Sequence, residues 1–193
     1  MPKQARPLLD REIIRLTQGC TPRDRAIVWC CLGAGLRAAE AADLRIGDVG
    51  GDGAVLVRDG KGGEARLVYL SGQALEAVQQ HAATLEHKGE EDPLFPSRKR
   101  RKGRPVPMLA TSAVDLIKHL MVENGIANAS SHSLRRTHAQ GLEVRGTSPR
   151  IIQRQLGHRR LETTVQYLAA YPPGHREAVR TLEFVDRELS QSA

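Results

Sequence analysis

Aromatic residues are scarce in this chain. One tryptophan, three tyrosines and two phenylalanines together make up 3% of its 193 residues. A surface that stacks unpaired nucleic-acid bases needs an aromatic face for each base, so the composition disfavours a platform of that kind. Binding to a duplex through its phosphates requires no aromatic residue, and this possibility remains.

Long apolar runs are absent as well. The longest covers residues 26–36, only 11 residues, whereas a helix that spans a bilayer needs about 20. The N-terminal sequence MPKQARP lacks the apolar stretch of a secretory signal peptide. We therefore expect a protein that has no membrane segment and works in the cytoplasm.

Cysteine is represented only by Cys20, Cys30 and Cys31. An odd number with two adjacent members offers no disulfide framework and suits a reducing compartment. There is no CxxC pair, no His/Cys spacing typical of zinc, and no glycine fingerprint of a nucleotide-binding turn. The sequence predicts neither a metal nor a cofactor.

Positive charge is in excess, because 29 Lys and Arg residues outnumber 22 Asp and Glu residues and give a net charge of +7. This balance favours a polyanionic partner, nucleic acid before an acidic membrane surface. Six of the seven residues in 98–104 are basic, and we expect them to contact DNA phosphates; a solvated charged segment is the alternative. They are Arg98, Lys99, Arg100, Arg101, Lys102 and Arg104.

Apolar spacing and capping residues predict a mainly α fold with a small antiparallel β-sheet, an α+β class. Two β-rich runs, 54–57 and 66–70, flank a glycine-rich turn and predict a hairpin, with a possible third strand at 44–49. Residues 89–107 contain four prolines and are expected to form an exposed loop. Helices are expected at 8–18, 22–34, 37–43, 71–88, 111–124, 132–145, 149–156, 160–170 and 175–189.

Polar residues at helix ends suggest where an anion could bind. His132 and Arg135 lie three residues apart near the start of a predicted helix, where backbone N–H groups and the helix dipole favour an anion. Arg37 and Glu40 share the same spacing, so the carboxylate could orient the guanidinium. Taken singly, each pair is more typical of an ordinary helix surface.

Three further residues are ambiguous when considered alone. Lys61 lies in the glycine-rich turn, where a solvated ammonium is the ordinary outcome. His158 follows Gly157 at the end of a short helix that begins with Pro149. Tyr167 comes nine residues after His158, and tyrosine is usually a packing residue rather than a nucleophile.

The order of these segments resembles the catalytic domain of the tyrosine recombinases, the phage-integrase family. The resemblance extends from about residue 10 to about residue 185. The segments that carry it are GLRAAE at 35–40, GKGG at 60–63, HSLR at 132–135, LGH at 156–158 and TTVQY at 163–167.

The resemblance implies a site-specific recombinase in which Tyr167 attacks a DNA phosphate and forms a 3′-phosphotyrosyl link. Arg37 and Arg135 would bind the non-bridging oxygens, with Glu40 supporting Arg37. Lys61 would protonate the leaving 5′-oxygen. His132 and His158 would donate to the phosphoryl oxygens or help to take the tyrosine proton. These groups would make a metal unnecessary.

The resemblance also bears on organisation and partners. We expect one catalytic domain over 1–193, with a core at about 10–185 and a C-terminal helix at 175–189. That helix could pack on its own chain or on a neighbour. We expect no N-terminal core-binding domain, a layout that resembles the short fimbrial-switch invertases.

The implied partner is double-stranded DNA, bound by a homo-oligomer of two to four subunits, with DNA-bending or partner-recombinase proteins as possible accessories. Two other functions are compatible with the same fold. One is a relaxing enzyme like the type IB topoisomerases, and the other is a non-catalytic DNA-binding regulator.

Overall fold

The computed structural model describes residues 5–58 and 65–169, with side chains described up to residue 165. Its helices lie close to the predicted segments. In the N-terminal part they are α1 (Asp10–Thr17), α2 (Pro22–Gly33), α3 (Ala38–Ala42), the 3-10 turn η1 (Ile46–Asp48) and α4 (Gly72–Ala83). They continue with α5 (Ala110–Glu123), α6 (Ser131–Val144), α7 (Pro149–Leu156) and α8 (Leu161–Ala169).

The first predicted hairpin is present. β1 (Ala54–Val57) pairs antiparallel with β2 (Arg66–Tyr69), and Val55 lies opposite Val68, both of them buried. The expected third strand at 44–49 is wrong, because this segment forms η1 with only isolated bridges at its ends. The Asp48 carboxylate accepts the Arg45 backbone N–H at 2.9 Å, and this local bond favours a turn over an extended strand.

The expected loop at 89–107 is wrong in its second half, which contains a second hairpin. β3 (Pro96–Arg101) pairs with β4 (Arg104–Pro107). Lys102 and Gly103 both have positive φ, 49° and 78°, as a tight two-residue hairpin turn requires. Pro96, Pro105 and Pro107 lie at strand ends or on an edge strand, where a missing N–H is tolerated, so they do not prevent pairing.

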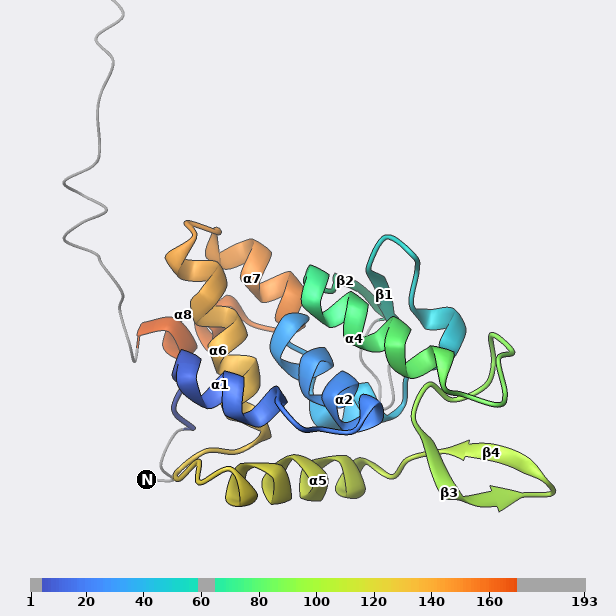
Figure 1. Cartoon of the computed structure of the whole chain (residues 1–193). Helices are drawn as coiled ribbons and strands as arrows, with labels where there is room; N and C mark the ends of the chain where they lie inside the picture. Colours follow the sequence, from blue (N-terminus) through green and yellow to red (C-terminus); the bar gives the residue numbers. More distant parts are fainter. Residues whose placement is uncertain (1–4, 59–64, 170–193) are drawn as a thin grey trace, which may run out of the picture.

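Helix α2 forms the centre of the main core. It packs against α4, α6 and α3, and Figure 1 shows it in the middle of the molecule with α5 along one edge. Ile27, Leu36 and Phe95 are among the largest fully buried side chains. A smaller cluster of Ala139, Ile152 and Leu156 joins α6 to α7.

Local caps set several helix ends where the sequence indicates them. The Thr21 and Ser71 hydroxyls accept the backbone N–H groups of Asp24 and Ala74, at 3.2 and 3.3 Å. Helix α4 ends at Ala83 rather than near residue 88. There the Thr84 hydroxyl donates to the His81 carbonyl at 2.7 Å and competes with a further helical turn.

A half-buried histidine on α6 makes the stability of the fold depend on pH. Burial lowers the pKa of His138 to about 4, while its Nδ1 lies 3.0 Å from the Leu32 carbonyl. The unfolded chain takes up the proton near pH 6.5 and the folded chain does not. The free energy of unfolding should therefore fall as the pH drops from about 6.5 towards 4, by at most about 1.4 kcal/mol per pH unit for this group.

Urea denaturation at pH 7.5 and pH 5 measures this effect. His138→Phe removes the titrating group, so the variant should lose less stability between the two pH values than wild type. Burial lowers the pKa of His81 and His158 in the same direction, so part of the pH dependence should remain. An unchanged loss in the variant would contradict the assignment.

Candidate active site

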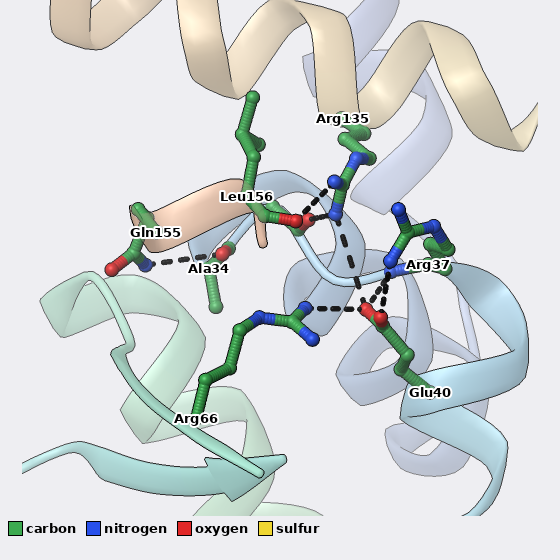
Figure 2. Close-up of polar contacts among 8 residues, drawn as sticks. Ala34, Arg37, Glu40, Arg66, Arg135, Gln155 and Leu156 are labelled. Carbon is green, nitrogen blue, oxygen red and sulfur yellow. Dashed lines mark hydrogen bonds and ion pairs between the residues drawn. The ribbon is translucent and has the colours of Figure 1, made fainter. Parts of the chain in front are cut away.

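The Glu40 carboxylate on α3 is the centre of an arginine cluster, shown in Figure 2. Its Oε1 accepts from Arg37 Nη1 at 2.6 Å, and its Oε2 accepts from Arg66 Nη2 at 2.8 Å. Arg135 Nη1 lies 3.9 Å from Oε2. The Arg37 backbone N–H also donates to Oε2, at 2.8 Å, so the carboxylate caps its own helix. The Glu40 carboxylate thus contacts Arg66 and Arg135, which lie 26 and 95 positions further along the chain.

Arg135 is the buried member of this cluster, with 3% of its side chain exposed. It comes from α6, and its two Nη atoms donate to the backbone carbonyls of Gly35 and Leu156. Gly35 follows the end of α2, and Leu156 is the last residue of α7. Arg135 therefore joins the ends of two helices, which excludes the ordinary-surface interpretation for this residue.

Arg37 and His132 face solvent. Arg37 has 45% of its side chain exposed while it contacts Glu40, and His132 is exposed in the first turn of α6. The predicted Arg37–Glu40 contact is present. Arg37 and Arg135 contact the same carboxylate, so the structure brings these two predicted residues together at one place.

His158 lies beside the arginine cluster. Gly157, with φ of 64°, ends α7 in the left-handed region and turns the chain into His158, whose Nδ1 lies 2.9 Å from the Thr164 hydroxyl. Burial, with the charges of Arg135, Arg37 and Arg66, lowers the pKa of His158 to about 4. The imidazole is therefore neutral at neutral pH, and its surroundings favour an anion over another cation.

Arg66 is a member of the site that the sequence did not reveal. It begins β2 next to a glycine-rich turn, and nothing in its neighbours distinguishes it from a solvated strand residue. Its side chain lies against Gly157, where an ideal Cβ would be 2.5 Å from Arg66 Nε. Glycine is thus required at position 157 both for the backbone conformation and for the space that Arg66 occupies.

Several predicted residues are not placed by the structure. Lys61 and the predicted helix at 175–189 lie outside the described residues. Tyr167 belongs to α8 in the backbone, but its side chain lies outside the described part.

The basic run 98–104 forms the β3–β4 hairpin, which Figure 1 places at the other end of the molecule from α7 and α8. The run is exposed and does not join the arginine cluster.

Comparison with known proteins gives the class to which this fold and site belong. The chain matches the family described as "Phage integrase family" over residues 7–172, and it belongs to that family.

Two relatives are tyrosine recombinase XerA from Pyrococcus horikoshii and tyrosine recombinase XerC from Erythrobacter litoralis. Each is 33% identical, over 86% and 87% of this chain and 57% and 51% of the relative. The chain thus spans about half the length of these curated relatives.

Solved structures agree with this assignment. A crystal structure of XerA recombinase superposes with a TM-score of 0.78 at 26% identity, over 95% of this chain and 68% of the other. The Tn1549 transposon integrase in complex with transposon right end DNA has the same fold, with a TM-score of 0.72 at 18% identity, over 93% of this chain and 66% of the other. The mainly helical recombinase fold predicted from the sequence is confirmed.

Membrane spans and metal clusters are absent from residues 5–58 and 65–169. No helix in these two ranges is both long and apolar enough to cross a membrane. No three His, Cys, Asp or Glu side chains in the same part of the chain gather as a set of metal ligands.

Gly35, whose carbonyl accepts from Arg135, is the position where the packing around this anchor can be tested. Its φ is +68°, and a Cβ there would be 2.7 Å from the His138 ring and 2.8 Å from Leu156. Gly35→Ala should therefore suffer both backbone strain and a steric clash. Gly19 is the matched control, because its φ is +75° with nothing within 4 Å of the added Cβ.

We expect Gly19→Ala to cost about 1 kcal/mol of unfolding free energy through strain alone. Gly35→Ala should cost at least about 1 kcal/mol more, since a packed site has to shift. Urea denaturation of both variants measures the difference. Equal losses would show that the surroundings of Gly35 are not tightly packed.

Proposed function

We propose that this chain is the catalytic part of a site-specific recombinase that breaks and rejoins duplex DNA through a 3′-phosphotyrosyl intermediate. Membership of the phage integrase family and the tyrosine recombinase relatives support this function. The observation that carries it is the arrangement of Arg37 and Arg135 on one carboxylate, beside His158. Two guanidinium groups held together match the planar oxygens of a phosphate diester.

The proposed reaction needs no group beyond this chain and its DNA. The Tyr167 oxygen attacks phosphorus, the bond from phosphorus to the 5′-oxygen breaks, and Lys61 gives its proton to that oxygen. His132 or His158 takes the tyrosine proton. Arg37 and Arg135 stabilise the charge that develops on the non-bridging oxygens. A 5′-hydroxyl from another strand then attacks the phosphotyrosine and releases Tyr167, so no ATP is consumed.

The neutral state of His158 fits its proposed role. Its Nδ1 lies 2.9 Å from Thr164 Oγ1, and this contact orients the ring beside the arginine cluster. A bound phosphate brings negative charge to a ring whose pKa is held low by burial and by the charges of three arginines. The pKa of His158 then rises, and the ring becomes a better proton acceptor only once the DNA is in place.

The proposed partners follow from the same function. We propose that the chain acts on double-stranded DNA as a homo-oligomer of two to four subunits, with accessory DNA-bending or partner-recombinase proteins. The single catalytic domain and the cytoplasmic location expected from the sequence remain predictions. So does the likeness of its layout to the fimbrial-switch invertases.

Trapping of a covalent adduct tests the proposed chemistry. Wild-type protein is incubated with a library of nicked duplex DNA, in which the nick lets the freed 5′-hydroxyl fragment diffuse away before rejoining. We expect an adduct that survives SDS, and sequencing the trapped DNA gives the target. Tyr167→Phe should abolish the adduct, because the phenolic oxygen is the attacking atom.

Tyr69→Phe is the matched control, since Tyr69 is 55% exposed on β2 and outside the proposed machinery. This variant should form the adduct as wild type does. An adduct from Tyr167→Phe, or none from wild type, would overturn the mechanism. Binding without cleavage would favour a regulator, and relaxation of supercoils at any sequence by a monomer would favour a topoisomerase-like enzyme.

The β3–β4 hairpin is proposed as a second site that binds DNA phosphates. Arg98, Arg101 and Arg104 are exposed, whereas Arg100 contacts Glu86 at 3.2 Å and His87 at 2.8 Å. Replacing the first three with Gln should lower the log–log salt slope of duplex binding by up to about 2.7, at about 0.9 for each phosphate that the protein no longer neutralises.

Fluorescence anisotropy of a labelled duplex across a salt series measures the slope. A control with the same change in net charge replaces exposed Arg11, Arg25 and Lys118 with Gln. We expect this control to change the slope by less than one unit. If both triple variants behave alike, the hairpin contributes only through overall charge.

A further inference from the structure

We propose that Arg66 is a positioning residue for the cleavage site, which fixes the Glu40 carboxylate in the place from which that carboxylate holds Arg37. The effect on cleavage rests on the proposed function. The effect on Glu40 does not, because it is a property of the free protein.

The two oxygens of Glu40 divide the arginines between them. Oε1 accepts from Arg37 at 2.6 Å, while Oε2 accepts from Arg66 at 2.8 Å and from the Arg37 backbone at 2.8 Å. Arg66 therefore holds one oxygen and leaves the other directed at the exposed guanidinium, as Figure 2 shows. Without Arg66, the carboxylate keeps the hydrogen bonds from Arg37 itself, through its backbone N–H and its guanidinium, and loses the one from another element, β2, that fixes the position of both groups.

Arg66 is itself held on two sides. Its guanidinium contacts Glu40 on α3, and its side chain lies against the backbone of Gly157 at the end of α7. Only 20% of the side chain is exposed, compared with 45% for Arg37. A packed arginine is restricted to few conformations, which suits it to orient a neighbouring group.

The packing of Arg66 also distinguishes it from a solvated ion pair. Its Nε is buried and has no hydrogen-bond partner within the described ranges. Burying a cation is costly unless a partner compensates for the lost water, and here Glu40 is that partner. The Arg66 guanidinium and the Glu40 carboxylate thus each offset the cost of burying the other.

Electrostatics agree with this arrangement. Burial by itself would raise the pKa of Glu40, but hydrogen bonds from Arg66 and from the Arg37 backbone, with the charges of both residues, hold it below its ordinary value. Arg66 also adds to the positive potential at His158. Without Arg66, the pKa values of both Glu40 and His158 should rise.

Arg66→Met tests the proposal, with Arg58→Met as the matched control. Arg58 directly follows the partner strand β1 and forms its own ion pair, with Asp48 at 2.6 Å. Removing it deletes the same kind of side chain but none of the hydrogen bonds that Glu40 accepts from Arg37 and Arg66. NMR titration of the free protein gives the pKa values of the Glu40 carboxyl and the His158 ring, and adduct formation on the trapped DNA gives the cleavage rate.

We expect Arg66→Met to raise both pKa values and to slow cleavage at neutral pH by about 10- to 100-fold, the scale of a small misplacement of a reacting group. The acid limb of its pH–rate profile should move to higher pH, since protonated Glu40 no longer holds Arg37. Duplex affinity should change by less than about threefold. Arg66→Lys should restore most of the rate, and Arg58→Met should match wild type.

Other results would overturn the proposal. An unchanged Glu40 pKa in Arg66→Met would show that Arg66 does not fix the carboxylate. A large fall in duplex affinity and salt slope would mark Arg66 as a direct phosphate ligand instead. Equal losses in Arg58→Met, or no rescue by lysine, would indicate a structural role only.

Two provisions keep the outcomes separable. If Arg66→Met fails to fold by circular dichroism, Arg66→Gln retains an amide donor for Oε2 while removing the charge. It should still raise the pKa of His158 and of Glu40. If wild-type protein forms no adduct, the proposed function fails, while the two pKa measurements still decide whether Arg66 holds Glu40.

Discussion

A half-buried carboxylate surrounded by guanidinium groups sets the geometry of this site. Three arginines, from the N-cap of α3, from α6 and from the start of β2, would repel one another if they were brought together without a counter-charge. Glu40 removes part of that repulsion and directs each cation through a specific oxygen. Three positive charges and one negative charge leave a net excess of two. The folded protein thus presents a fixed cationic site that an anion can complete.

Backbone carbonyls provide the second constraint. The last carbonyls of a helix have no partner within it, and the C-terminal end of its dipole favours a cation. Arg135 donates to Leu156, the last residue of α7, and to Gly35 just beyond α2. The same side chain therefore satisfies exposed acceptors and brings two helix ends together. Stability of the fold and placement of the cation are consequences of one set of hydrogen bonds.

Local patterns predicted much of the fold and part of the site. The caps at Thr21 and Ser71, the β1–β2 hairpin and the Arg37–Glu40 contact depend on residues close in sequence, so spacing and residue type identify them. Four prolines concealed the β3–β4 hairpin, because a proline on an edge strand resembles one in a loop. The two strands were missed although their turn at 102–103 is well formed.

The remaining features depend on contacts between residues far apart in the sequence. Arg66 contacts Glu40 across 26 residues, and Arg135 contacts Gly35 across 100. No local sequence pattern predicts these contacts, because they form only when α3, α6, α7 and β2 pack together.

The choice of arginine over lysine follows from these two constraints. A guanidinium has five N–H donors in a fixed plane, whereas an ammonium is a point charge on a flexible stem. Arg135 uses Nη1 and Nη2 for two carbonyls, and Arg37 uses Nη1 for Glu40. Arg37 has further N–H groups in the same plane as that bond, and 45% of its side chain is exposed. In the proposed function, Arg37 can therefore bind a phosphate while its Nη1 stays on Glu40, so this contact need not break during the reaction.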